Sequence, residues 1–102
     1  MPTVFITAPA GAAQSIAQTI VKERLAACVN RVACVSTYRW QGEVRADDEE
    51  ILLAKTTDKR YSDLRDRVAE IHPHDVPCIE RFDETDITTS FAEWRAQNVT
   101  GS

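Results

Sequence analysis

The chain has 102 residues, of which 43% are hydrophobic and 27% are charged. This length has room for one domain, which we expect to span residues 1–102, and the composition is that of a globular protein rather than a disordered one. Sixteen Asp and Glu against twelve Lys and Arg give a formal net charge of −4. That balance argues against binding to nucleic acid or to anionic membranes.

The first residues and the cysteines bear on the cellular compartment. The N-terminal segment has neither the basic nor the apolar region of a secretory signal peptide, and no apolar run approaches the length of a membrane span. The odd number of cysteines, Cys28, Cys34 and Cys78, then indicates free thiols in a reducing cytoplasm. We expect Cys28 and Cys34 to be small buried hydrophobic side chains, about 20 Å apart on one strand.

The first half of the chain predicts a strand, a helix and a long hairpin. Residues 3–7 are β-branched and aromatic, which is typical of a strand. From residue 12 to residue 26, apolar residues recur with the spacing of one buried helical stripe. Residues 27–40 and 43–56 contain no Gly or Pro, and the Gln-Gly pair between them is a turn signal. These two stretches therefore predict one antiparallel hairpin.

This hairpin is longer than the body that carries it. Each arm has about 13 residues, or roughly 43 Å of strand. A compact chain of about 100 residues has a radius of gyration near 13 Å and a diameter of roughly 34 Å. The tip carries Tyr38, Trp40 and Val44, which a single chain can hardly cover. We therefore expect the hairpin to lie on another subunit.

A second helix and a fourth strand follow the hairpin. Asp58 is the expected helix cap, and the helix ends at His72, the residue before a proline. The buried stripe of this helix consists of Tyr61, Leu64, Val68 and Ile71. Residues 76–83 read as a strand, and Pro77 places it at a sheet edge or marks the start of the strand.

A short third helix ends the chain. A capping box from Ser90 to Glu93 opens it, Phe91 and Trp94 are expected to face inward, and residues 98–102 are expected to fray. The resulting order, β-α-β-β-α-β plus a final helix, is the ferredoxin-like α+β plan with helices on one face of an antiparallel sheet. The other face of that sheet needs cover from neighbouring subunits.

The strongest chemical signal is a pair of histidines, His72 and His74, separated by a proline. Two imidazoles at this spacing suit Cu or Zn, with the thiol of Cys78 or Cys28 nearby. The alternative is that the proline simply stops the helix and leaves a histidine at the surface. The acidic run at residues 47–50 resembles a clamp for Ca²⁺ or Mg²⁺, but successive strand residues face opposite ways, so we interpret it as solvated.

Other chemistry has weaker support in the sequence. Arg24 and Lys55 are candidates for binding an anion at a subunit boundary, or alternatively for a capping or interface ion pair. The scattered glycines form neither a P-loop nor a dinucleotide fingerprint, and there is no Gly-x-Ser-x-Gly elbow. No pair of nucleophile and base is apparent, so we expect no enzymatic activity.

Seven short segments, in order along the chain, resemble the CutA family of divalent-cation tolerance proteins. They are residues 7–9 (Thr-Ala-Pro), 24–30 (Arg-Leu-Ala-Ala-Cys-Val-Asn), 36–42 (Ser-Thr-Tyr-Arg-Trp-Gln-Gly), 53–56 (Leu-Ala-Lys-Thr), 72–73 (His-Pro), 76–77 (Val-Pro) and Trp94. The set spans nearly the whole chain, and its order makes the resemblance specific.

The resemblance implies a homotrimer of ferredoxin-like subunits whose long hairpins wrap their neighbours. It also implies binding of Cu(II) or other divalent cations, as in some members, and no established catalysis. By position, His72 is the best metal candidate and Cys28 a weaker one. The candidates for a cleft between subunits are Arg24, Asn30, Tyr38, Trp40, Lys55 and Trp94.

This chain departs from the copper-binding members at two expected ligands. Where those members carry a Cys and a second His, it has Ile6 and Ile71. Two other donors, His74 and Cys78, stand where the family usually has Tyr and Glu. We therefore hypothesise a shifted metal site built from His72, His74 and Cys78.

The sequence thus predicts a cytoplasmic, trimeric, non-enzymatic protein that binds divalent metal weakly and takes part in the response to metal ions. A first alternative is a trimeric sensor, similar in architecture to PII signal proteins, with a small anion in the clefts between subunits. A second alternative is a scaffold whose exposed apolar surface docks another protein.

Overall fold

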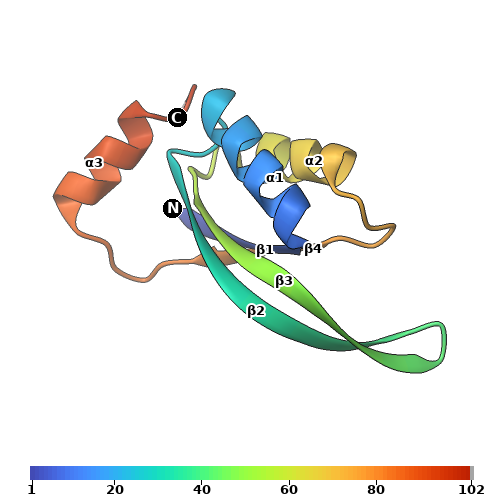
Figure 1. Ribbon diagram of the computed structural model, residues 1–102. Helices are drawn as coiled ribbons and strands as arrows, with labels where there is room; N and C mark the ends of the chain where they lie inside the picture. Colours follow the sequence, from blue (N-terminus) through green and yellow to red (C-terminus); the bar gives the residue numbers. More distant parts are fainter. Residues whose placement is uncertain (102) are drawn as a thin grey trace.

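The computed structural model describes residues 1–101, which form four strands and three helices in the predicted order (Figure 1). The elements are β1 (Pro2–Ala8), α1 (Ala10–Lys22), β2 (Cys28–Trp40), β3 (Glu43–Lys55), α2 (Tyr61–Ile71), β4 (Cys78–Asp83) and α3 (Thr89–Gln97). All strand pairs are antiparallel and the sheet order is β2-β3-β1-β4. This arrangement confirms the predicted ferredoxin-like α+β topology.

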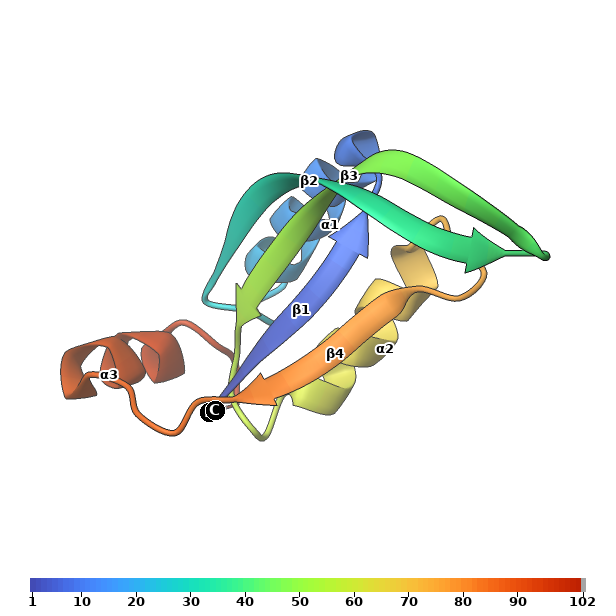
Figure 2. The ribbon, with the colours of Figure 1, turned by 90° about the horizontal axis from the view of Figure 1, so that it is seen from below.

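Helices α1 and α2 cover one face of the sheet, and Figure 2 shows the strands in front of them. Alternate residues of the two central strands point into this layer, as the twofold period of a strand requires. The fully buried side chains from the sheet are Val4, Ile6, Ala8, Leu52 and Ala54, and those from the helices include Ile16, Ile20, Leu64 and Val68. This cluster is the hydrophobic core, and it matches the predicted helical stripes except at Val21 of α1, which is 38% exposed.

The remaining, alternate residues of the strands point to the opposite face of the sheet. Phe5 and Phe82 meet on it edge to face, with ring centroids 6.0 Å apart. Phe82 is 52% exposed and Val32 is 50% exposed. We call the side of the sheet away from α1 and α2 the open face. Large apolar side chains left on such a face mark a surface for association.

The hairpin of β2 and β3 has two arms of 13 residues each. Strand β1 pairs only with residues 50–55 of β3, so residues 43–49 pair with β2 alone. This outer half projects past the helices and β4 (Figures 1 and 2). The long axis of the molecule is 44 Å and its radius of gyration is 14.0 Å. The predicted overhang is therefore confirmed.

The ends of α1 differ from the predicted helix over residues 12–26. The helix starts at Ala10, because Pro9 takes the capping position and its carbonyl accepts the Ala13 N–H at 2.8 Å. It ends at Lys22, because Arg24 adopts a left-handed conformation with φ of 60°. That residue turns the chain back toward the sheet.

Two expected helix caps are wrong. Arg60, not Asp58, occupies the N-cap position of α2, while the Asp58 carboxylate bonds with Arg81. Helix α3 starts at Thr89, after Thr88, so Ser90 lies inside the helix. The fourth strand begins at Cys78 rather than at residue 76, because the intervening proline has no N–H to donate to the ladder.

The C-terminal predictions are corrected as well. Helix α3 lies beside the end of the sheet (Figure 1), so Trp94 is 42% exposed and stacks on Phe91 instead of entering the core. The buried residue of α3 is Arg95. The expected fraying is wrong for Val99, which is buried, and for Thr100, whose N–H donates to the Arg24 carbonyl at 3.0 Å.

The three cysteines are free and each is partly exposed within the single chain. The expectation that Cys28 and Cys34 are buried is therefore not met in this chain, because both belong to the open face. Across residues 1–101, no helix combines the length and the apolar character needed to cross a bilayer.

Candidate functional site

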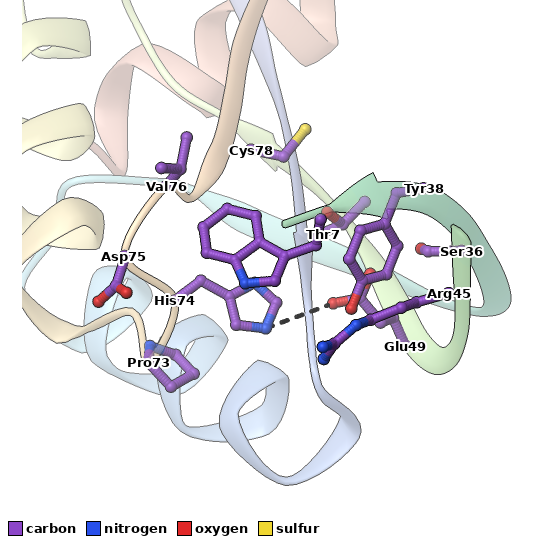
Figure 3. Close-up of a pocket in the computed structure, with 11 residues that line it drawn as sticks. Thr7, Ser36, Tyr38, Arg45, Glu49, Pro73, His74, Asp75, Val76 and Cys78 are labelled. Carbon is purple, nitrogen blue, oxygen red and sulfur yellow. Dashed lines mark ion pairs between the residues drawn. The ribbon is translucent and has the colours of Figure 1, made fainter. Parts of the chain in front are cut away.

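A cavity of about 440 Å³ lies on the open face, where the hairpin bends toward the loop between α2 and β4 (Figure 3). The strand register explains why its lining residues converge. Tyr38 pairs with Arg45, and Thr7 pairs with Cys78, so all four side chains emerge on one face. The lining residues are Thr7, Ser36, Tyr38, Trp40, Arg45, Glu49, Pro73, His74, Asp75, Val76 and Cys78.

Glu49 and His74 face each other across this cavity (Figure 3). The Glu49 Oε2 atom lies 4.0 Å from His74 Nε2, which is too long for a hydrogen bond. The Glu49 side chain is only 6% exposed, and its Oε2 has no hydrogen-bond partner among the described residues. A buried carboxylate oxygen without a partner is costly, so this atom marks a place where a donor group is missing.

The predicted metal ligand His72 forms two hydrogen bonds within the single chain. Its Nδ1 accepts the His74 backbone N–H at 3.0 Å, and its Nε2 lies 2.8 Å from the Thr7 carbonyl oxygen. Because Nδ1 accepts, Nε2 must carry the proton and donate to Thr7. Both ring nitrogens are therefore engaged, and His72 joins the end of α2 to β1.

Cys78 and Cys28 do not complete a metal site either. The Cys78 thiol lies 3.5 Å from Glu80 Oε1, and burial raises its pKa, which disfavours the thiolate that binds metals. Cys28 pairs with Lys55 at the other end of the sheet. Within residues 1–101, no three His, Cys, Asp or Glu side chains gather closely enough to hold a metal ion. The hypothesised site of His72, His74 and Cys78 is not assembled in the single chain.

The six candidates for a cleft between subunits fall into two groups. Tyr38 and Trp40 line the cavity. Trp94 belongs to α3, and the remaining three lie near the opposite end of the sheet. There Lys55 Nζ donates to Asn30 Oδ1 at 3.1 Å, and Arg24 donates to the Gln97 carbonyl at 3.0 Å. Arg24 and Lys55 thus have separate polar partners within the single chain, and both stay predictions for a cleft between subunits.

The interpretation of residues 47–50 as solvated is wrong for Glu49. Asp47 and Asp48 are exposed, and Glu50 forms a two-pronged ion pair with Arg31. Glu49 turns to the open face and is buried. Strand alternation was the available signal, because Glu49 is in register with Cys34 on the same face as the predicted cleft residue Tyr38.

Hydrogen bonding also fixes the rim of the cavity. The Tyr38 hydroxyl donates to the Asp47 carboxylate, and this bond raises the pKa of Tyr38. Arg45 lies 3.8 Å from the Glu43 carboxylate. Within residues 1–101, Glu49 inside the cavity has no such hydrogen bond at its Oε2 atom, which lies 4.0 Å from His74 Nε2.

These features define a small ferredoxin-like α+β protein with an extended central hairpin and a cavity at the base of its overhang. The family model for CutA1 divalent ion tolerance protein matches residues 2–98, and the chain belongs to this family. The resemblance seen in the sequence is therefore confirmed. The family is named for ion tolerance and not for a chemical reaction.

Individual relatives agree over nearly the full chain. The divalent-cation tolerance protein CutA of Thermus thermophilus is 43% identical over 98 residues, covering 94% of this chain and 95% of that protein. Its structure superposes with a TM-score of 0.91 at 42% identity, covering 97% and 99% of the two chains. The CutA1 structure from Pyrococcus horikoshii gives a TM-score of 0.94 at 32% identity, covering 98% and 99%.

A plant relative matches over part of its own length. The Arabidopsis thaliana protein named CutA, chloroplastic, is 38% identical over 93 residues, which cover 89% of this chain and 51% of that protein. Its name places that relative in a plastid, whereas the names of the Thermus and Pyrococcus proteins state no compartment.

Proposed function

We propose that this chain is a divalent-cation tolerance protein that works as a cytoplasmic homotrimer and not as an enzyme. The observation that carries this proposal is the match over residues 2–98 to a family named for divalent ion tolerance. The agreement of sequence and fold over almost the whole chain with a protein of that name supports it.

The proposed trimer accounts for two features of the single chain. The overhanging part of the hairpin, residues 43–49, pairs only with β2. The open face leaves Val32 and Phe82 about half exposed. Association through this face removes that apolar surface from water and gives the overhang a support.

Metal binding in this chain is proposed to be weak and to include Cu(II) or another divalent cation. Of the four predicted donors, His74 is best placed, because its Nε2 faces the cavity while both nitrogens of His72 are engaged. Additional donors would have to come from neighbouring copies, since a close group of three is not found in residues 1–101. Structural metal sites usually need three or four protein ligands.

Native mass spectrometry with metal analysis of the untagged protein tests the assembly and the bound ion together. A Cu(II) titration then compares the wild type with His74→Ala and His72→Ala. We expect His74→Ala to weaken Cu(II) binding, and His72→Ala to lower stability through the lost bond to Thr7. Equal Cu(II) affinity in His74→Ala and wild type would refute the role of His74, and a monomer at micromolar concentration would refute the trimer.

A further inference from the structure

The cavity contains two polar side-chain atoms that face each other without a hydrogen bond between them. The Glu49 Oε2 atom and the His74 Nε2 atom are 4.0 Å apart. When the neutral His74 ring carries its proton on Nδ1, its Nε2 accepts, and a single donor nitrogen placed about 2.8–2.9 Å from each atom can bond to both. The pair is therefore spaced for one protonated nitrogen of a bound molecule.

Burial of the Glu49 carboxylate restricts the kind of group that can bind beside it. The Glu49 side chain is 94% buried, as its exposed fraction is 6%, and its Oε2 has no hydrogen-bond partner among the described residues. A carboxylate removed from water in this way is stabilised by a group that brings both hydrogen bonds and positive charge. The neighbouring Glu50 shows the contrast, because its carboxylate is held by two bonds from Arg31.

The walls of the cavity suit an organic body rather than a bare ion. Tyr38 and Trp40 contribute aromatic rings, and Pro73 and Val76 contribute aliphatic surface. A volume of about 440 Å³ is within the range of small-molecule sites, which are mostly apolar with a few placed polar groups. Aromatic faces also attract organic cations.

The other polar groups of the cavity have contacts of their own. Arg45 lies within 4 Å of Glu43 at the mouth, and the Tyr38 hydroxyl is bonded to Asp47. The remaining lining carboxylate, Asp75, points away from the His74 ring in Figure 3.

We propose that this cavity binds a small organic cation, with a flat apolar body against the aromatic side chains and one protonated nitrogen between Glu49 and His74. The proposal does not depend on metal binding. The proposed ligand is a cation, whereas the PII-like alternative named above would bind an anion.

Benzamidine is a suitable probe, because it joins a flat ring to a cationic amidine, and benzoate is its anionic counterpart. The assembled protein is titrated with EDTA present, so that the outcome is independent of any metal site. The titration is carried out in a Trp94→Phe background, where Trp40 is the remaining tryptophan. We expect a saturable change in Trp40 fluorescence with benzamidine and none with benzoate.

The variant Glu49→Gln keeps the shape of the side chain and removes its charge, and we expect it to weaken benzamidine binding by about tenfold or more. The matched control Glu50→Gln makes the same charge change outside the cavity and should leave the affinity within about twofold. His74→Leu, which removes the imidazole proposed to accept the second hydrogen bond, should also weaken binding. Circular dichroism and native mass establish that each variant is folded and assembled.

Three results would overturn the proposal. The first is equal benzamidine affinity in wild type and Glu49→Gln. The second is absence of saturable binding in the folded wild-type assembly. The third is a crystal structure of the assembly in which a Lys or Arg of a neighbouring copy bonds to Glu49 Oε2, because the cavity would then be a contact between copies.

Discussion

Arg95 is the largest fully buried side chain among residues 1–101, and it is charged. Its Nη1 lies 2.9 Å from Glu84 Oε1, and it donates to the carbonyls of Pro2 at 3.2 Å and Thr56 at 3.4 Å. These partners come from β1, from the chain after β3 and from the chain after β4. One guanidinium thus joins α3 to three separate segments, and its charge is balanced in a region that excludes water.

Replacing this side chain should destabilise the fold strongly. Arg95→Met keeps much of the apolar stem but leaves the Glu84 carboxylate without its charge partner. We expect the free energy of unfolding to fall by about 3 kcal/mol, the scale for breaking one side of a buried pair. Urea denaturation at fixed protein concentration measures it. Arg65→Met, which removes an exposed partner of Asp66, is the control and should change it by less than about 1 kcal/mol.

The partner carboxylate gives the molecule a defined acid sensitivity. Burial alone would raise the pKa of Glu84, but hydrogen bonds from Thr3 and Arg95 outweigh burial and hold the pKa below its usual value of 4.5. A carboxyl whose pKa is lowered by folding contributes stability above its unfolded pKa. That contribution is lost as the pH falls through the lower, folded pKa.

We therefore expect Glu84→Gln to lower stability at pH 7 and to have a smaller effect at pH 3. The wild type should lose part of its unfolding free energy as the pH drops below about 4.5, and the variant should lose less. Urea denaturation across this range measures both. Glu93→Gln, on the exposed side of α3, is the matched control. An equal pH slope in wild type and Glu84→Gln would show that this carboxyl is not the group involved.

At the scale of elements, the hairpin depends on its two-residue turn. Gln41 has φ of 51° and Gly42 has φ of 81°, so both residues are in the left-handed region. Two such residues form the turn that matches the twist of a hairpin, and Asn-Gly is its preferred pair. Gln41 therefore adopts a left-handed backbone conformation that is less favourable for Gln than for Asn.

Substitutions at this turn should move stability in opposite directions. A Cβ on Gly42 would meet no atom within 4 Å, so Gly42→Ala isolates the backbone cost, which we expect to be about 1 kcal/mol. Gln41→Asn should raise stability by a few tenths of a kcal/mol. Thermal unfolding at one protein concentration measures both changes. A stabilising effect of Gly42→Ala would contradict the left-handed geometry.

The helices and strands differ in how well the sequence predicts them. The hairpin was predicted to within a residue at each end, because strand patterning and one glycine turn are local signals. The inward placement of Trp94 failed, because an apolar residue in a short helix does not reveal where that helix lies. The ion pair of Arg95 was not predicted, since its partners come from segments far apart in the sequence.

The site was harder to predict than the fold, because it also depends on contacts between segments far apart in the sequence. Tyr38 and Trp40 were candidates, and the structure places both in the cavity. Glu49 was missed, because its burial depends on the loop at residues 73–76, which approaches the open face from the other half of the chain. The metal hypothesis at His72 stays a prediction, because proximity in sequence to His74 did not show that in the single chain both of its ring nitrogens are hydrogen-bonded.

At the scale of the whole molecule, the dimensions of 44 × 25 × 19 Å describe a thin body with a protruding ribbon. A two-stranded ribbon by itself is marginally stable in water. Both the apolar open face and the ribbon therefore lead us to expect that the chain is stably folded only as an oligomer. The stability of such a chain depends on its concentration.

A charge placed on the open face should test this expectation directly. Phe82 is 52% exposed in the single chain and contacts Phe5, so Phe82→Glu would bury an uncompensated carboxylate if copies associate there. We expect the assembly to dissociate at concentrations at least about tenfold higher than those at which the wild type dissociates. Sedimentation velocity over a dilution series measures this. Val21→Glu adds the same charge to a 38% exposed position on α1 and should leave the assembly intact. Loss of assembly in both variants would point to general destabilisation, and intact assembly in Phe82→Glu would place the contact on another surface.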